Sequence, residues 1–277
     1  MKNYFLYIKR FECVSFLGCL FFFGILITGC NNLSEPTEKL SIERLPALNI
    51  AWDSTNSIVC FGTSLTYGLI WDKLEPVSPV YSLKTFETSA KITDAFFYHQ
   101  ADSAYPHCLD KILEIKVYNR GFVGATTERA LELVQDSVLS YNPALVILEF
   151  SANDFLRGTE VSIAKANMDT LITIIQNFGS EIVLISFVDQ YTLENPPKDH
   201  FLYDQINLAK EYFSMLQDLS IQYDILFIKD CFQGIFGNKE YMCDDIHPNE
   251  KGYAKMANNI FYSLYHTFTQ NNMYKIN

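Results

Sequence analysis

The stretch Ile58-Val59-Cys60-Phe61-Gly62-Thr63-Ser64-Leu65-Thr66-Tyr67-Gly68 joins a short apolar run to a hydroxyl-rich turn that lies between two glycines. A run of β-branched and aromatic residues that ends in glycine is typical of a buried strand in a parallel sheet. Ligands of open α/β sheets bind beyond the carboxyl ends of such strands, so this turn would present Ser64 at a functional edge. An ordinary strand followed by a polar turn also fits, and other parts of the chain must distinguish the two.

The overall composition is that of a globular protein. The chain has 277 residues, of which 49% are hydrophobic and 19% are charged, and this is enough for a sizeable core. Its formal net charge of -11 disfavours nucleic acid and anionic membrane surfaces as partners of the folded body. The sequence contains no internal repeat and no sign of a second domain boundary.

The first residues form a cationic and then apolar leader. An apolar run over residues 14–27 follows three cations, which are Lys2, Lys9 and Arg10. This order is typical of a secretory signal. We therefore expect residues 1–29 to be a signal peptide, with an uncleaved anchor helix as the alternative.

The leader ends in Ile27-Thr28-Gly29-Cys30, which resembles the bacterial lipobox, where the cysteine thiol is lipidated and becomes the mature N-terminus. Acyl chains on Cys30 would hold the protein to a membrane without spanning it. Residues 30–50 carry prolines and charges without periodicity, which predicts a flexible tether to a domain over residues 51–277. Asn31 resembles the sorting residue of outer-membrane lipoproteins, so we expect a lipid-anchored protein of the bacterial cell envelope.

Four cysteines follow the expected lipidation site, namely Cys60, Cys108, Cys231 and Cys243. An oxidising compartment permits disulfides, and Cys231 and Cys243 are the closest pair in sequence. Three full pairings are open, and the sequence does not choose among them. Cys60 lies inside a predicted strand and is expected to be a small core residue.

Strands and helices alternate along the rest of the chain. Hydrophobic periodicity predicts strands at 58–61, 115–118, 145–148, 182–185 and 225–228, and helices at 105–113, 126–138, 162–178, 203–221 and 250–268. Such alternation implies a parallel sheet with right-handed crossovers. The long segment 69–101 fits no regular element, and we expect either a functional lid or a partly structured region.

Polar residues follow the predicted strands and precede the last helix. Asn119 and Asn153 come after two strands, where asparagine commonly stabilises a turn. Asp244 and His247 lie just before the last helix, and Asp244 could act as a cap. Cys243-Asp244-Asp245 with His247 could also be read as metal ligands, although no second cluster with ligand spacing accompanies them. Phosphate-binding glycine loops are absent.

Together, these residues resemble the SGNH/GDSL hydrolase family from Ile58 to Ile260, and most closely its lysophospholipase/thioesterase-like esterases. The matching blocks, in the family's order, are Gly62-Thr63-Ser64-Leu65, then Asn119 with Gly121 and Gly124, then Asn153-Asp154, and finally Asp244 with His247. The resemblance implies a three-layer α/β/α, flavodoxin-like fold built on a five-stranded parallel sheet.

The residue types suit the chemistry that the resemblance implies. A serine hydroxyl is a poor nucleophile at neutral pH, and the near-neutral imidazole of His247 suits the role of its base. Asp244 can orient that ring and stabilise the imidazolium. By resemblance, the backbone amides of Ser64 and Gly121 and the side-chain amide of Asn153 form the oxyanion hole. This chemistry requires no metal or organic cofactor.

Two residues depart from the family pattern. Thr63 stands where aspartate is usual, and because that residue supports the serine turn rather than reacting, we expect little loss. Ser151 stands where the third block usually has glycine, two places before Asn153. We expect Ser151 to tilt Asn153 and to lower efficiency without changing the reaction class.

The expected function is that of a serine esterase cleaving carboxylic esters or thioesters through an acyl-Ser64 intermediate, with lysophospholipid-like or other acyl esters as substrates. A polysaccharide or peptidoglycan O-acetylesterase is the alternative, and an acyltransferase uses the same intermediate. A non-catalytic envelope lipoprotein that keeps the fold as a binding module is the alternative of another class. We expect a monomer whose partners are its ester substrate and, through the anchor, a membrane.

Overall fold

The computed structural model describes residues 55–71, 98–113, 115–198 and 200–270. The predicted signal peptide 1–29, lipidation site Cys30 and tether 30–50 lie outside the described residues, as does most of segment 69–101. None of the helices in the described ranges combines the length and the apolar character needed to cross a bilayer.

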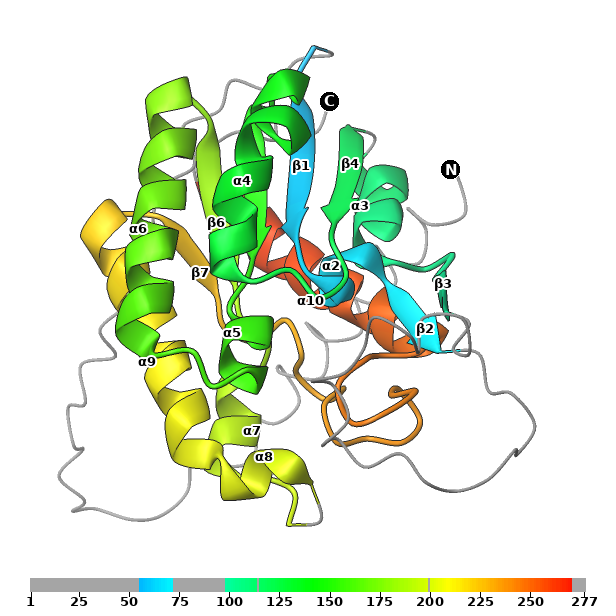
Figure 1. Ribbon diagram of the computed structural model, residues 1–277. Coiled ribbons are helices and arrows are strands. Elements are labelled where there is room, and N and C mark those ends of the chain that lie inside the picture. The colour runs from blue at the N-terminus through cyan, green and yellow to red at the C-terminus, as the bar shows by residue number, and fades with distance from the viewer. Residues whose placement is uncertain (1–54, 72–97, 114, 199, 271–277) are drawn as a thin grey trace, which may run out of the picture. The chain divides into compact units, whose positions relative to one another are not determined.

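Five parallel strands form the central sheet, in the order β4-β1-β5-β6-β7 (Figure 1). This confirms the predicted five-stranded parallel sheet. All carboxyl ends therefore meet at one edge, where the turn after β1 lies between the ends of β4 and β5. The strands are β1 (Ser57–Gly62), β4 (Lys116–Gly121), β5 (Leu145–Glu149), β6 (Glu181–Ile185) and β7 (Leu226–Ile228).

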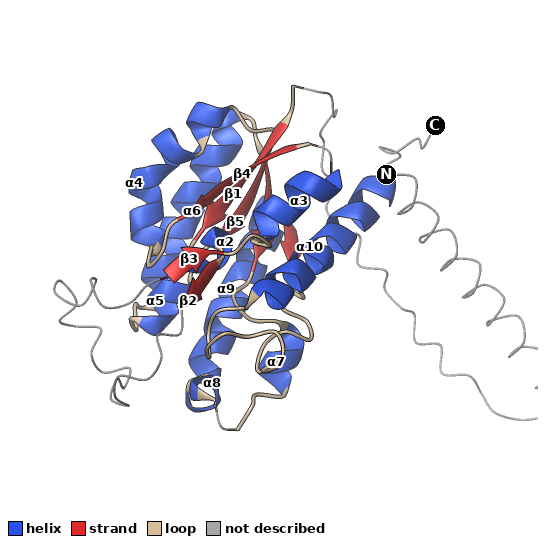
Figure 2. Ribbon diagram, turned by 90° about the vertical axis from the view of Figure 1, so that its right-hand side faces the viewer, coloured by secondary structure: helices blue, strands red, loops and turns tan. Residues whose placement is uncertain are grey.

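Helices cover both faces of this sheet, which gives the predicted three layers. In Figure 2, α4 and α6 lie on one side of the sheet, and α3 and α10 lie on the other. The crossover from β1 outward to β4 runs opposite to the later crossovers, so right-handed connections place α3 on the face opposite α4 and α6. The long helices are α3 (Tyr105–Leu113), α4 (Thr127–Ser137), α6 (Val161–Phe178), α9 (Ile206–Tyr223) and α10 (Glu250–Gln270).

Short helices and one small sheet complete the domain near the strand ends. The helices are α2 (Ser64–Tyr67), the 3-10 turn η2 (Leu139–Tyr141), α5 (Ala152–Leu156), α7 (Gln190–Glu194) and α8 (Phe201–Asp204). The two ends of segment 69–101 pair as antiparallel strands, β2 (Leu69–Trp71) and β3 (Tyr98–Gln100). That segment is therefore structured where it joins the domain.

The core lies between the sheet and its two helical layers. Strands β1 and β5 are buried along their whole length, as their continuous apolar runs predict. Helix α10 buries one apolar face in this core, and Tyr265 lies at the edge of that face and is 36% exposed. The buried residues of that face are Tyr253, Met256, Ala257, Ile260 and Leu264.

One predicted helix is divided in the structure. The pattern over 203–221 predicts a single helix, whereas α8 ends at Asp204 and α9 begins at Ile206. The imidazole of His200 accepts a hydrogen bond from the Leu202 amide and starts α8, and the non-helical backbone of Gln205, with φ of -111° and ψ of 16°, separates α8 from α9. Apolar periodicity alone does not report such a side-chain cap.

The four cysteines of the domain are free thiols, so Cys231 and Cys243 are not paired. Cys60 is fully buried in β1, which confirms its predicted core position. Burial also raises the pKa of the Cys60 thiol far above its usual range. Cys231 is likewise buried and donates to the Ser186 carbonyl oxygen at 3.2 Å.

Candidate active site

Ser64, His247 and Asp244 form a continuous series of hydrogen bonds at the carboxyl edge of the sheet. The distance from His247 Nε2 to Ser64 Oγ is 2.9 Å. On the other side of the ring, His247 Nδ1 lies 2.8 Å from Asp244 Oδ2. Ser64 opens α2 directly after β1, and both Ser64 and His247 are more than nine-tenths buried. The structure thus brings together the three predicted catalytic residues.

The loop that carries His247 is folded by the carboxylate of Asp244. Asp244 Oδ1 accepts hydrogen bonds from the backbone amides of Ile246 and His247, each at 2.6 Å. Burial alone would raise the pKa of Asp244, but the hydrogen bonds and charge of His247 and the Ile246 amide hold it below its ordinary value. Asp244 is therefore a carboxylate at neutral pH, as a partner of imidazole must be.

A second histidine supports the same loop, and sequence reasoning did not single it out. The Nε2 atom of His200 lies 2.7 Å from the carbonyl oxygen of Asp245. Because its Nδ1 accepts from the Leu202 amide, the proton of a neutral ring must reside on Nε2, which donates to Asp245. His200 thereby links the start of α8 to the loop between Asp244 and His247.

The turn that presents Ser64 is capped by the neighbouring threonine. Thr63 Oγ1 accepts from the Leu65 amide at 3.3 Å, and the left-handed Gly68 ends the short helix with φ of 85°. Thr63 therefore supports the turn, as expected for the residue that replaces aspartate. Its hydroxyl also contacts the buried carboxylate of Glu149, which is the last residue of β5 and which sequence reasoning did not select as a site residue.

Asn153 offers a fixed side-chain amide beside the serine turn. Its Nδ2 donates one hydrogen bond to the Ala125 carbonyl oxygen at 2.8 Å. A primary amide carries two N–H groups, so the contact with Ala125 fixes the orientation while leaving a second donor. The backbone amide of Ser64 lies in the first turn of α2, where N–H groups have no acceptor within the helix.

The predicted role of Gly121 is corrected by the structure. Its backbone N–H donates to Asn119 Oδ1 at 3.0 Å, so this proton is not free for an oxyanion. A Cβ atom at position 121 would lie 2.0 Å from the backbone nitrogen of Tyr67. Glycine is required here because β4 passes directly against α2, and the sequence pattern cannot distinguish such a packing role from an oxyanion role.

The second glycine of the same block is better placed beside Asn153. Gly124 has φ of 76°, and its carbonyl oxygen accepts from the guanidinium of Arg157 at 2.8 Å. It directly precedes Ala125, whose carbonyl oxygen holds the Asn153 amide. The loop containing Gly124 and Ala125 is thus tied to both ends of α5.

Ser151 adopts the backbone conformation of the glycine that it replaces. Its φ is 96°, in the left-handed region that serine rarely occupies. The side chain is fully buried, and among the described residues its Oγ has no hydrogen-bond partner. The helix that follows is intact, since the Phe155 amide donates to the Ser151 carbonyl oxygen at 2.9 Å. The backbone strain is therefore confined to Ser151, and α5 keeps its regular hydrogen bonding.

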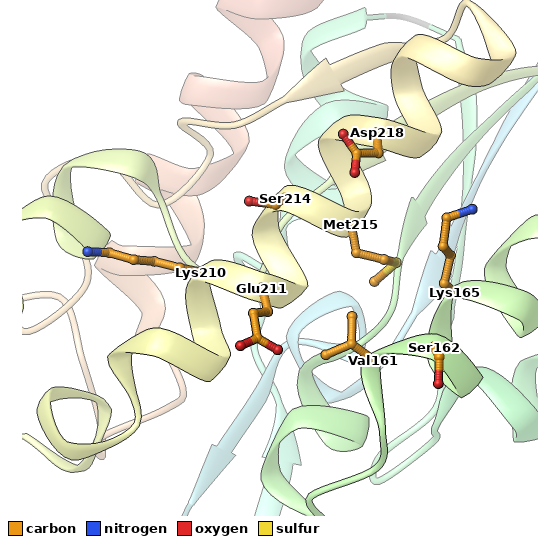
Figure 3. A pocket seen from close by; sticks show the side chains of 8 residues that line it. All are labelled: Val161, Ser162, Lys165, Lys210, Glu211, Ser214, Met215 and Asp218. Carbon is orange, nitrogen blue, oxygen red and sulfur yellow. The ribbon is translucent and has the colours of Figure 1, made fainter.

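One hollow in the described surface lies away from these residues. It has a volume of about 390 Å³ and lies between α6 and α9 (Figure 3). Figure 3 shows the side chains of Lys165 and Lys210 pointing away from each other, so they do not converge on one ligand group. Its two serines, Ser162 and Ser214, have no histidine beside them in the lining. This groove has no catalytic arrangement.

A small apolar cavity lies directly behind the site. Its volume is about 20 Å³, and three of its lining residues each adjoin a predicted site residue in sequence: Leu65, Ala152 and Ile246. The remaining lining is aromatic and aliphatic, consisting of Phe155, Leu156, Phe187, Phe201, Leu202 and Phe236. The cavity is therefore an apolar recess bordered by the serine, asparagine and histidine segments.

A three-layer α/β/α domain with serine, histidine and aspartate in hydrogen-bonded series at its sheet edge has the architecture of an ester-bond hydrolase. Residues 60–255 match the GDSL-like lipase/acylhydrolase family, and the chain belongs to this family. This confirms the family resemblance noted in the sequence, and the protein is accordingly an enzyme that acts on ester bonds.

Individual relatives are distant. An arylesterase from Vibrio mimicus is 25% identical over 166 residues, which cover 56% of this chain and 76% of that protein. The psychrotrophic esterase EstA from Pseudoalteromonas sp. aligns with a TM-score of 0.55 at 18% identity, over 77% of this chain and 99% of that chain. An acetylxylan esterase from Geobacillus stearothermophilus gives a TM-score of 0.55 at 14% identity, over 78% of this chain and 96% of that chain. These structures share the fold.

Proposed function

We propose that this enzyme is a serine esterase in which Ser64 is the nucleophile, His247 is the general base and Asp244 orients the imidazole. The observation that carries the proposal is the unbroken series of hydrogen bonds from Ser64 Oγ through the His247 ring to Asp244. In this series Nδ1–H is donated to the carboxylate, so Nε2 is free to accept the serine proton.

The reaction follows from this arrangement. Ser64 Oγ attacks the ester carbonyl carbon while its proton moves to His247 Nε2. The tetrahedral intermediate then collapses, and the leaving alcohol or thiol takes that proton from His247. Water attacks the resulting acyl-Ser64 in the same way, with His247 as base, and releases the carboxylic acid and free serine.

The oxyanion requires fixed donors, and we assign them to the Ser64 amide, the second N–H of Asn153 and the amide of Gly124. The Ser64 and Asn153 donors retain their expected roles, and Gly124 replaces Gly121, whose amide is engaged by Asn119. Removing one such donor typically costs about 100- to 1,000-fold in kcat.

The apolar cavity favours a short acyl group. A single water molecule needs roughly 10–15 Å³ of such space, so a volume of about 20 Å³ admits little more than a methyl-sized group. We therefore propose acetyl-type esters as substrates in preference to the lysophospholipid-like esters expected from the sequence. The relative from Vibrio mimicus is named an arylesterase, which supports an ester as the substrate.

A chain-length series tests both parts of the proposal. Initial rates on p-nitrophenyl acetate, butyrate, octanoate and palmitate should fall steeply after acetate, and Ser64→Ala should abolish hydrolysis of all four. A maximum at octanoate or palmitate would reject the short-acyl substrate. Folded wild-type protein that neither hydrolyses these esters nor reacts with a fluorophosphonate would instead favour a non-catalytic binding module.

We also propose that Cys30 carries the lipid anchor in the cell envelope. The support is the cationic and apolar leader, followed by the lipobox-like Ile27-Thr28-Gly29-Cys30. Radiolabelled palmitate fed to bacteria that express the full chain should label the wild type and Cys19→Ala, but not Cys30→Ala. Equal labelling of Cys30→Ala and the wild type would contradict the assignment.

A further inference from the structure

Glu149 is a buried carboxylate that the reaction above does not use. It ends β5, and its side chain is fully buried. None of the ion pairs among the described residues involves Glu149, so hydrogen bonds rather than a cation accompany its carboxylate. An uncompensated buried carboxylate is costly, and its presence beside the serine turn calls for a physical reason.

The donors to Glu149 come from both sides of Ser64. Before the nucleophile, Thr63 donates its backbone N–H to Oε2 at 2.9 Å and its hydroxyl to the same oxygen at 2.8 Å. After the nucleophile, Thr66 donates its hydroxyl to Oε2 at 3.0 Å. One carboxylate oxygen therefore holds the two residues that flank the Ser64-Leu65 pair.

The direction of these hydrogen bonds is fixed by the charge. An ionised carboxylate only accepts, so the single proton of Thr66 Oγ1 is committed to Glu149. The contact between Thr66 Oγ1 and the Tyr105 hydroxyl, at 3.0 Å, must then be donated by the tyrosine. Tyr105, Thr66 and Glu149 thus form a directed relay that anchors the turn to α3.

Gly62 provides the space for this carboxylate. A Cβ atom at position 62 would lie 2.1 Å from Thr66 Oγ1 and 2.7 Å from Glu149 Oε2. The last residue of β1 must therefore lack a side chain if the carboxylate is to reach the turn. Glycine at 62 and glutamate at 149 are two parts of the same local structure.

We propose that Glu149 is a positioning residue that sets the geometry of the Ser64 turn through Thr63 and Thr66. It does not contact the reacting atoms and acts through these two neighbours. The inference rests on the proposed role of Ser64 as nucleophile. A displacement of a reacting group by about 1 Å can cost on the order of 100-fold in rate, so loss of the anchor should appear in kcat.

Glu149→Met and Glu149→Gln test the proposal at pH 8. Methionine removes both acceptors, whereas glutamine can place its oxygen where Oε2 lies. We expect Glu149→Met to lower kcat by about 10- to 100-fold, with KM within about twofold, and to slow fluorophosphonate labelling of Ser64 in parallel. Glu149→Gln should recover most of the rate. Retention of wild-type kcat in folded Glu149→Met would overturn the proposal.

Asp189→Leu is the matched control for a merely structural effect. Asp189 is also buried and accepts from the amide and hydroxyl of one threonine, Thr192, at 2.9 and 2.8 Å. The Asp189→Leu variant should have a lower Tm, as Glu149→Met should, but its kcat and its rate of fluorophosphonate labelling should stay near the wild-type values. A similar fall in kcat for Asp189→Leu and Glu149→Met would contradict the positioning role and show that Glu149 only stabilises the fold.

Threonine variants keep the experiment decisive if Glu149→Met does not fold. Thr66→Val removes the hydroxyl while keeping its shape, and Thr66→Ser keeps the hydroxyl. We expect Val but not Ser to lower kcat, and equal rates in both would refute the proposal. Ser64→Ala distinguishes failure of the proposed function from failure of the positioning role. If Ser64→Ala stays active, Ser64 is not the nucleophile. If Ser64→Ala is inactive while Thr66→Val is fully active, only the positioning role of Glu149 is rejected.

Discussion

Asp244 holds His247 at two points: Oδ2 lies 2.8 Å from the ring Nδ1, and Oδ1 accepts the His247 backbone amide at 2.6 Å. The same carboxylate therefore shapes the loop and orients the base. Because one side chain makes both contacts, Asp244 and His247 can be brought together although they are only three residues apart.

Asp244→Asn should consequently lose activity far more than stability. An amide in place of Oδ2 favours the wrong imidazole tautomer, and we expect kcat on p-nitrophenyl acetate to fall by about 1,000- to 10,000-fold. Asp245→Asn is the control, because Asp245 is the exposed neighbour and contacts His200 through its backbone carbonyl oxygen. Similar kcat values for the two variants would contradict the assigned role of Asp244.

Glu149 should make stability depend on pH. Burial raises its pKa to about 7, against the hydrogen bonds from Thr63 and Thr66, which lower it. Because the folded protein binds the Glu149 proton more tightly than the unfolded chain does, protonation of Glu149 stabilises the fold. This stabilisation is fully present below the unfolded-state pKa of 4.5 and is lost as pH rises through about 7. The wild type should therefore lose up to about 3 kcal/mol relative to Glu149→Gln between pH 4.5 and 8, measured by urea unfolding. Parallel profiles of the two proteins would show that Glu149 does not titrate in this range.

Ser151→Gly should stabilise the domain. Glycine relieves the left-handed backbone and removes the unpartnered buried hydroxyl, which together outweigh the added chain entropy by about 1–2 kcal/mol. Thermal unfolding should show Tm higher by about 2–4 °C for each kcal/mol. Asn142→Gly is the comparison, because Asn142 is left-handed yet exposed, and its gain should be smaller. A lower Tm for Ser151→Gly would show that the hydroxyl has a stabilising partner.

Phe201→Ala should widen the acyl preference. Phe201 lines the small cavity and is only partly buried, so its truncation should enlarge the recess at modest cost in stability. We expect the ratio of kcat/KM for p-nitrophenyl octanoate over acetate to rise by about tenfold, the value of one or two buried methylenes. Phe227→Ala, in β7 and outside the cavity lining, should leave the ratio unchanged. An unchanged ratio in Phe201→Ala would exclude this cavity as the acyl subsite.

Much of the fold was predictable because the strands are continuous apolar runs that end in polar residues. Ser64 and Asn153 follow two predicted parallel strands, which share a carboxyl edge, whereas Asp244 and His247 were expected beside Ser64 from the resemblance to the SGNH/GDSL family. The structure brings Ser64, Asp244 and His247 into contact as the sequence pattern indicated.

Other parts depend on three-dimensional contacts that leave no pattern in the sequence. Whether the Gly121 amide is free depends on where the Asn119 side chain turns, and the start of α8 depends on the cap made by the His200 side chain. Glu149 is one acidic residue among many, and nothing in its local sequence indicates that Thr63 donates to it across 86 residues. Such contacts become visible only when the strands are assembled.

The contact between Ser64 and His247 joins positions 183 residues apart. A ribosome that has made β1 and its serine turn must translate all five strands before the histidine exists. The nascent chain thus carries the proposed nucleophile, Ser64, without its proposed base until translation reaches position 247. On this proposal, ester hydrolysis requires a chain translated through His247.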